Sequence, residues 1–415
     1  MAGTNHPMSR WNIYLSAGSA LFLTIAILRH PEAAFSASLE GLKIWFDIVL
    51  PALLPFFAMS EILMGLGVVH FIGVLLEPLM RPLFRIPGVG AFAVAMGLAS
   101  GYPIGAKITA QLRRQGLCNS TEGERLVSFA NTADPLFMVG AVAIGMFGIQ
   151  EIGWTITAAH YLSVVVVGFL MRFLPEKSQP AVGPASLSSK GGNILSRAFK
   201  TLEEARMRDG RAFGQLFGDA IRETLASMLF IGGCIMVFSV LGRILDVSGA
   251  TKAIQQCLAL VLRPLGVSDA VIPPLLRGII EITIGCEAIS QANASLLVRT
   301  AVAGFIIGWS GLSVHTQVAT MIRGTDIRLG PYIAARMLHG ILAAVMTVLV
   351  WRPVAALATS GLPMPFTVGI GEASFLSRAA TSLKTAAGCT ALLVTLGLIL
   401  NIVRSIRIIY IRIRP

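Results

Sequence analysis

Apolar stretches alternate with short basic segments along most of the chain. An α-helix of about 20 apolar residues is long enough to cross the hydrocarbon core of a bilayer. The pattern therefore predicts an all-α polytopic membrane protein. Its expected membrane-spanning helices lie at residues 11–28, 41–67, 126–147, 154–173, 218–245, 300–322, 331–351 and 379–403.

Two further apolar stretches are interrupted near their middle. Residues 89–112 carry Ser-Gly-Tyr-Pro-Ile-Gly at 100–105, and residues 270–296 carry Glu-Ile-Thr-Ile-Gly-Cys-Glu at 281–287. Each stretch is expected to form two half-length helices, because glycine, proline and buried charge interrupt a helix. Such a pair forms a re-entrant hairpin, which enters and leaves the membrane on one side. The spans 126–147 and 300–322 are also broken, at residues 131–135 and 308–311.

The same order of elements occurs twice, in residues 41–173 and 215–352. Each block crosses the membrane three times, and an odd number of crossings inverts the second block relative to the first. The predicted fold class is therefore an inverted repeat of two blocks, each with a re-entrant helical hairpin and broken helices. An N-terminal transmembrane helix (1–40), a basic linker (174–214) and a segment with a loop, the last helix and a basic tail (353–415) complete the chain.

The basic residues set the expected orientation. Cytoplasmic loops are rich in Lys and Arg, which places the 174–214 linker and the C-terminal tail in the cytoplasm. Ala-Phe-Ser-Ala at 34–37 leaves open whether the first helix is cleaved, and we expect it to be retained.

Composition excludes most soluble functions. Hydrophobic residues make up 55% and charged residues 13% of the 415 positions, and the mean hydropathy is +0.76. Ordinary soluble domains are about 25% charged. The net charge of +12 comes mainly from loops and helix ends, which is typical of a membrane protein rather than of nucleic-acid binding. The five cysteines have no metal-ligand spacing, and no Ser/His/Asp set is evident, so we expect no metal, no cofactor and no enzymatic activity.

The helix breaks locate the expected binding site. In transporters with inverted repeats, half-helix ends and unwound backbone meet near the bilayer midplane, and helix N-termini attract anions. Glu281, Glu287 and His315 are the expected carriers of coupling charge or protons, because a carboxylate at membrane depth costs ~2.5–3.5 kcal/mol and by default marks a site. The expected substrate-binding residues are Ser100, Gly101, Tyr102, Gly105, Lys107, Asn131, Thr132, Asp134, Thr283, Gly285, Ser310, Ser313, Thr316 and Gln317.

Simpler roles stay open for several of these positions. The small residues could only allow close helix packing. The Lys107 side chain could extend to the membrane surface, and His315 could be an ordinary buried residue.

Three motifs of the first block resemble a known family. They are Gly-Leu-Ala-Ser-Gly-Tyr-Pro-Ile-Gly-Ala-Lys at 97–107, Glu-Gly-Glu-Arg-Leu-Val-Ser-Phe at 122–129 and Asn-Thr-Ala-Asp-Pro-Leu-Phe at 131–137. All three are similar to the YlbJ (also called SpoVV) family of sporulation integral membrane proteins. The second block agrees with this family mainly in its layout.

The resemblance implies that the two blocks are GATE-like repeats, named for nucleoside recognition. It also implies a likeness to the spore maturation proteins SpmA and SpmB and to concentrative nucleoside transporters. The implied location is the outer forespore membrane, on the mother-cell side, and the implied task is the transport of dipicolinic acid during spore formation.

Dipicolinate is a small aromatic dicarboxylate, so its site needs donors and positive potential. We expect the hairpin at 100–107 to hold this anion and the hairpin at 281–287 to handle coupling charge, because two like charges repel. One alternative is a transporter of nucleosides or another small neutral metabolite, and another is a non-transporting sporulation scaffold that recruits partners through the linker. The expected partners are the lipid bilayer and a small anionic substrate, with no nucleic acid, and the oligomeric state stays open.

Overall fold

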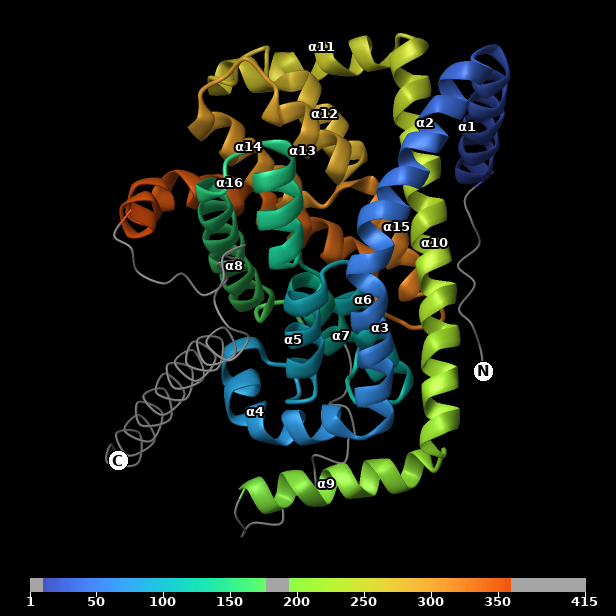
Figure 1. The fold of residues 1–415 in the computed structure, drawn as a ribbon, viewed down its shortest axis with the longest axis vertical. Coiled ribbons are helices and arrows are strands. Elements are labelled where there is room, and N and C mark those ends of the chain that lie inside the picture. Colours follow the sequence, from blue (N-terminus) through green and yellow to red (C-terminus); the bar gives the residue numbers. More distant parts are fainter. Residues whose placement is uncertain (1–9, 177–193, 360–415) are drawn as a thin grey trace, which may run out of the picture.

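The computed structural model describes residues 10–176 and 194–359, and within these ranges every regular element is a helix (Figure 1). Among the described residues, four helical segments are long and apolar enough to cross a membrane: Glu151–Met171, Phe213–Val247, Leu296–Met321 and Leu329–Trp351. A bent pair, Phe57–Gly65 and Val68–Leu76, makes a fifth. The predicted all-helical membrane class is confirmed. The predicted last span, 379–403, lies outside the described residues.

The elements in chain order, with their bounds, are α1 (Arg10–Arg29), α2 (Pro31–Ile44), η1 (Trp45–Val49), α3 (Leu50–Gly65), α4 (Val68–Phe84), α5 (Gly90–Ser100), α6 (Ile104–Arg114), α7 (Ser120–Ala130), η2 (Leu136–Met146), α8 (Glu151–Met171), α9 (Ile194–Asp209), α10 (Phe213–Val247), α11 (Ala250–Leu262), η4 (Arg263–Leu265), α12 (Ile272–Ile280), α13 (Ile282–Ser290), α14 (Leu296–Trp309), α15 (Gly311–Met321) and α16 (Leu329–Thr359).

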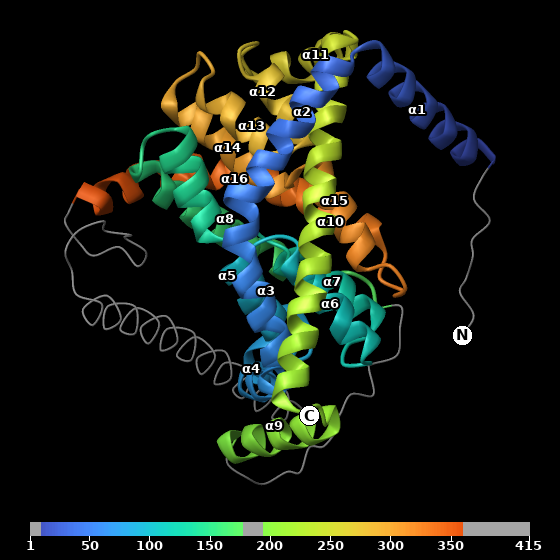
Figure 2. The same cartoon turned by 45° about the vertical axis from the view of Figure 1, so that its right-hand side comes forward.

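Two long helical rods lie side by side along one edge of the molecule (Figures 1 and 2). One is α10, with 35 residues, and the other is the continuous helix α2–η1–α3. The π-helical stretch η1 ends two residues before Pro51, which has no backbone N–H to donate to the carbonyl four residues earlier. The Trp45 indole of η1 donates to the Met228 carbonyl of α10 at 3.0 Å, which fixes the two rods together.

One end of the molecule is closed by two helices that lie across it. The chain bends by 82° between α3 and α4, and α9 packs against α4 on the outer side (Figure 1). Gly67 forms this bend with φ +81°, and a Cβ there would lie 2.6 Å from the Leu202 carbonyl of α9. The Phe71 and Phe199 rings, 5.0 Å apart, join the two helices.

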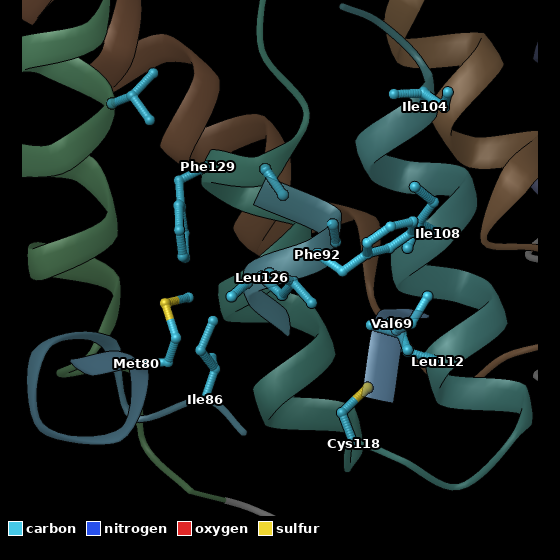
Figure 3. Packing of buried hydrophobic residues seen from close by; sticks show 14 of the residues in the cluster. Val69, Met80, Ile86, Phe92, Ile104, Ile108, Leu112, Cys118, Leu126 and Phe129 are labelled. Atoms are coloured by element: carbon cyan, nitrogen blue, oxygen red, sulfur yellow. The ribbon is translucent and has the colours of Figure 1, made fainter. Parts of the chain in front are cut away.

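The helices α4, α5, α6 and α7 share one apolar core (Figure 3). Met80 and Ile86 lie near Phe129, while Phe92 and Ile108 fill the space between α5 and α6. This packing holds α5 and α6 against α7.

A second core crosses between the halves of the chain. It joins η2 and α8 to α12, α13 and α14. The last described helix, α16, packs along both α8 and α14. The contact with α14 is close, because a Cβ on Gly308 would lie 2.6 Å from the Gly340 Cα. The inverted relation between the two blocks and the count of eight crossings stay predictions.

Candidate functional site

The α5–α6 pair breaks where the sequence predicts. Gly101 has φ +73° and φ/ψ values outside the helical region, and α6 restarts at Ile104. A Cβ on Gly97 would lie 1.8 Å from the Ala130 carbonyl oxygen, and one on Gly105 would lie 2.1 Å from it. The absence of a side chain at these two glycines therefore lets both helices of the pair pack directly against the last carbonyl of α7.

The segment between α7 and η2 is buried and polar. Asn131 and Thr132 are both fully buried. The Thr132 hydroxyl lies 2.6 Å from His160 Nε2 on α8, and the Ala133 backbone N–H donates to the same nitrogen at 3.3 Å. Asp134 accepts from the Phe137 backbone N–H at 2.9 Å. Side chains thus provide partners for backbone that the helix no longer satisfies.

The helix α14–α15 is broken at Ser310, a non-glycine residue with φ +71°. Trp309 anchors the break, since its indole donates to the Ile279 carbonyl of α12 at 3.1 Å. The buried His315 ring donates through Nε2 to the Trp309 carbonyl at 2.9 Å and lies against the Trp309 ring, 4.2 Å between centroids. A backbone conformation this unfavourable for serine marks a strained position of the kind found at functional sites.

The α12–α13 pair breaks at Glu281. This carboxylate is only 3% exposed, and it caps α13 by accepting from the Ile284 backbone N–H at 2.9 Å. The two helices touch through glycine, because a Cβ on Gly285 would lie 2.1 Å from the Gly278 Cα. Glu281 therefore has a structural role at the start of α13.

The breaks of the two halves meet at one set of hydrogen bonds. The Tyr102 hydroxyl donates to the Ile307 carbonyl at 2.6 Å, and the Asn131 amide donates to the Tyr332 hydroxyl at 2.9 Å. Arg336 of α16 donates to the carbonyls of Asn131 and Ile307 at 3.1 and 3.3 Å. We name Tyr102, Asn131, Tyr332 and Arg336 the break cluster.

Arg336 is the main source of positive charge in this cluster. Its side chain is fully buried, and its guanidinium carbon lies 5.7 Å from the centre of the Tyr102 ring. Among residues 10–176 and 194–359, no carboxylate oxygen lies within 4.0 Å of its nitrogens. A buried guanidinium with no carboxylate this close makes its immediate surroundings positive. The Asp134 carboxylate lies on the other side of the break, at the Gly101 turn, where a Cβ on Gly101 would be 2.4 Å from its Oδ2.

The other predicted substrate residues fall into two groups. Ser100, Ser313 and Gln317 are buried, and the Ser100 hydroxyl has no partner among the described atoms. Thr316 is exposed, and Thr283 is partly buried. The structure thus brings the tip of the α5–α6 pair, the α7–η2 break and the α14–α15 break together.

Two predicted residues lie away from the cluster. The Lys107 ammonium pairs with Glu61 of α3 at 2.7 Å and donates to the Ser227 hydroxyl of α10 at 3.2 Å. Glu287 is exposed, unlike Glu281. Their functional roles remain predictions.

Four further buried residues are absent from the set expected from the sequence: Arg336, Tyr332, His339 and His160. All four are fully buried, and the His160 and His339 rings lie 4.4 Å apart. The signal was present, because an ionisable residue inside a predicted span is uncommon and by default marks a function. A search of the plain spans 154–173 and 331–351 for polar residues would have found them. In the described part of the chain, no group of three or more His, Cys, Asp or Glu side chains could hold a metal ion.

Comparisons with known proteins show which family the chain belongs to. Residues 46–150 match the family model described as Gate, nucleoside recognition. The chain is 42% identical over 346 residues to the sporulation integral membrane protein YlbJ of Bacillus subtilis (strain 168), which covers 83% of this chain and 84% of that protein. The chain belongs to the YlbJ family of sporulation integral membrane proteins.

The YlbJ family resemblance drawn from the motifs is therefore confirmed. A second relative, an uncharacterized protein of Alkalihalophilus pseudofirmus, is 30% identical over 210 residues, or 49% of this chain and 42% of that protein. A solved structure of a CNTnw variant in an outward-facing state covers 83% of this chain and 87% of its own, with 14% identity and a TM-score of 0.38. At that TM-score the likeness carries no conclusion.

Proposed function

We propose that this YlbJ-family protein is a transporter that moves a small aromatic dicarboxylate, dipicolinic acid, across the outer forespore membrane during spore formation. The observation that carries the proposal is the buried Arg336 guanidinium at the meeting point of the helix breaks, with no described carboxylate within 4.0 Å. The positive surroundings of this guanidinium favour an anionic substrate over a cationic one.

The chemistry of the break cluster suits an aromatic carboxylate. The planar guanidinium of Arg336 can donate two parallel hydrogen bonds to one carboxylate. The Tyr102 ring offers an aromatic face close to that cation, 5.7 Å from it. The unpartnered Ser100 hydroxyl supplies a further donor at the same break. A substrate that bound here would exchange the carbonyl partners of Arg336 for its own oxygens.

The proposal includes the inverted-repeat architecture. Each half contains a broken helix pair, α5–α6 or α12–α13, followed by a helix with a break of its own. We infer that both pairs are re-entrant hairpins of GATE-like repeats, at 41–173 and 215–352, with the linker in the cytoplasm. Alternating access would then move one pair of elements past the rods α2–α3 and α10. No catalytic activity, cofactor or nucleic-acid partner is part of the proposal.

Binding and uptake of dipicolinate by the purified full-length protein test the proposal. Calorimetry in detergent gives Kd, and proteoliposomes give the uptake rate. Loss of a charge-assisted hydrogen bond costs about 1.5–3 kcal/mol, so Arg336→Gln should weaken dipicolinate binding by about 10–150-fold. Ser100→Leu should abolish binding by filling the break with an apolar side chain.

Arg125→Gln is the matched control. Arg125 is also buried, at 1% exposed, and donates to two backbone carbonyls, those of Arg85 and Leu174, but it lies outside the break cluster. Its replacement should lower stability without changing Kd. Equal loss of binding in Arg125→Gln and Arg336→Gln, or unchanged binding in Arg336→Gln, would contradict the proposal.

A transporter of nucleosides or another neutral metabolite is the second candidate. The match of residues 46–150 to a nucleoside-recognition model favours it, together with the carboxylate at the α12–α13 break. In that case Glu281→Gln should lose binding of a nucleoside such as uridine, while Arg336→Gln keeps it. A non-transporting scaffold predicts instead that deletion of residues 177–193 abolishes spore maturation while transport by the purified protein is unchanged.

A further inference from the structure

A cavity of about 280 Å³ lies outside the break cluster and ends at Glu281. Its walls come from α2, the C-terminal half of α10, the start of α11 and the α12–α13 break. Charged side chains line it from three helices: Glu40 on α2, Arg243 and Asp246 on α10, and Arg277 on α12. At about 30 Å³ per molecule, the volume holds roughly nine waters, and a polar lining of this kind keeps them there.

The inner end of the cavity carries two buried polar groups. Glu281 is 3% exposed, and one of its carboxylate oxygens accepts a hydrogen bond from the Ile284 backbone N–H. Ser239 is also 3% exposed, lines the cavity, and has a hydroxyl with no partner among the described atoms. A buried hydroxyl without a partner is unfavourable, so water in the cavity is its natural partner.

The outer part of the cavity is wetter and has mixed charge. Arg277 and Asp246 form an ion pair across α12 and α10 at 3.5 Å, with side chains 47% and 27% exposed. Glu40 and Arg243 are both exposed. The charge around the cavity thus changes from mixed at the mouth to a carboxylate at the inner end.

The position of the cavity sets its sidedness. α10 runs from α9 at one end of the molecule to α11 at the other, and α12 lies beside α11 (Figure 1). The lining residues of α10 belong to its last third, and Thr251 of α11 completes the wall. The cavity therefore lies toward the end of the molecule opposite α9.

We propose that this cavity is the entry path for the coupling proton, which reaches Glu281 from the membrane side opposite α9. A hydronium ion in the cavity gives its proton to a carboxylate oxygen of Glu281, which forms an O–H bond and leaves water behind. The inference rests on the proposed transport function for its purpose, and it selects Glu281 over the exposed Glu287 as the protonated group.

The neighbouring groups are consistent with a carboxyl that changes charge. Beyond the charged residues of the cavity, α13 contributes the buried Cys286 thiol. On α15 the His315 ring is held by the Trp309 carbonyl and ring. Protonation of Glu281 removes the charge that caps α13, which weakens its bond to the Ile284 N–H. The proton thereby acts on the helix pair that we expect to move.

Carbodiimide labelling tests the protonation directly, because the reagent adds to protonated carboxylic acids. The full-length protein is oriented in sealed vesicles, and adducts at Glu281 are measured by mass spectrometry while the pH is changed on one side only. When the pH is raised on the α11 side, labelling should fall about tenfold for each pH unit above the titration midpoint. Labelling that follows the pH on the α9 side, or neither side, overturns the proposal.

Cysteine accessibility tests the path. The exposed Cys257 and Cys389, which lies outside the described residues, are first replaced by serine. Ser239→Cys should then react with a membrane-impermeant cationic thiol reagent added on the α11 side only. Thr224→Cys is the matched control, since Thr224 is a buried residue of α10 with an unpartnered hydroxyl that lies outside the cavity. Its reaction should be at least tenfold slower. Equal rates, or reaction of Ser239→Cys from the α9 side, contradict the path.

Both readouts work without substrate, so they separate this proposal from the transport proposal. If the wild type does not move dipicolinate while both labelling results hold, the substrate assignment is wrong and the proton path stands. If dipicolinate uptake is found and Glu281→Gln keeps its full pH dependence, the transport proposal stands and the proton path is wrong.

Discussion

The seam between the α5–α6 pair and α7 is closed by two glycines, and alanine at either position tests how tightly it is packed. A Cβ on Gly105 would lie 2.1 Å from the Ala130 carbonyl oxygen and 2.8 Å from the Asn131 nitrogen. Ordinary van der Waals contact at a Cβ begins at 3.4 Å, so α6 and α7 would have to move apart by more than an ångström. Both close atoms are backbone atoms, and no side-chain rotation can relieve the clash.

The size of the effect follows from these distances. Overpacking a well-filled interior costs about 1–3 kcal/mol, and occasionally more. At a helix position without a clash, Gly→Ala instead gains about 0.5–1 kcal/mol. We expect Gly105→Ala to lower the free energy of unfolding by at least 1 kcal/mol and Gly233→Ala on α10, where nothing lies within 4 Å of the added Cβ, to raise it slightly.

The assay is unfolding of the purified protein in detergent, followed by tryptophan fluorescence or by size-exclusion chromatography after heating. In Gly97→Ala the added Cβ would lie 1.8 Å from the same carbonyl oxygen. The double variant should therefore lose less free energy of unfolding than the sum of the two single variants. If Gly105→Ala is as stable as Gly233→Ala, α6 and α7 are not packed as closely as these distances require, and the prediction is wrong.

Three further predictions follow from ion pairs and from the topology. Lys107→Met should cost about 1–3 kcal/mol of stability, because it leaves the partly buried Glu61 carboxylate with only the Gln111 amide as its partner. The double change with Glu61→Leu should recover most of the loss in the same unfolding assay. Arg113 donates a hydrogen bond to Asp326 that holds the pKa of Asp326 below its ordinary value. The pair therefore stabilises the folded protein above about pH 4, and this stabilisation is lost as the pH falls through the lowered pKa. Asp326→Asn should remove this dependence, which is measured as the midpoint of acid unfolding. Ser196→Cys on α9 should react with an impermeant thiol reagent only from the cytoplasmic side, and reaction from outside intact cells would reject the predicted orientation.

The breaks in the helices could be predicted from the sequence because their causes are local. Gly101, Ser310 and Glu281 interrupt apolar stretches, and each proves to be a helix end in the structure. Glycine, proline and a capping carboxylate act on the backbone within a few residues of themselves. No knowledge of the rest of the fold is needed to place them.

The partners of side chains could not be predicted in the same way. Lys107 lies only one turn beyond its break, yet its ammonium meets Glu61, which is 46 positions earlier in the chain. That pairing depends on which face of α6 turns toward α3, which is a matter of tertiary packing such as the contact of Gly105 with the Ala130 carbonyl of α7. Arg336 binds carbonyls 205 and 29 residues away, so a single cation in an apolar span gave only a hint of its role.

The hydrophobic pattern also did not predict where the long helix α2–η1–α3 begins. The predicted span begins at residue 41, but the helix begins at Pro31. The additional turns contain Glu32 and Glu40, and their small buried residues, Ala34 and Ala37, form the contact face. A helix held by packing against neighbouring helices needs no continuous apolar stretch.

The bonds of Arg336 also order events during synthesis of the protein. Asn131 enters the membrane 205 residues before the arginine that binds its carbonyl. At about 5–20 residues per second, the ribosome needs roughly 10–40 s to make that interval. During this time the Asn131 carbonyl lies in the bilayer without Arg336, its partner in the finished protein. A chain whose synthesis stops before residue 336 therefore lacks the guanidinium that joins the Asn131 carbonyl of the first half to the Ile307 carbonyl of the second.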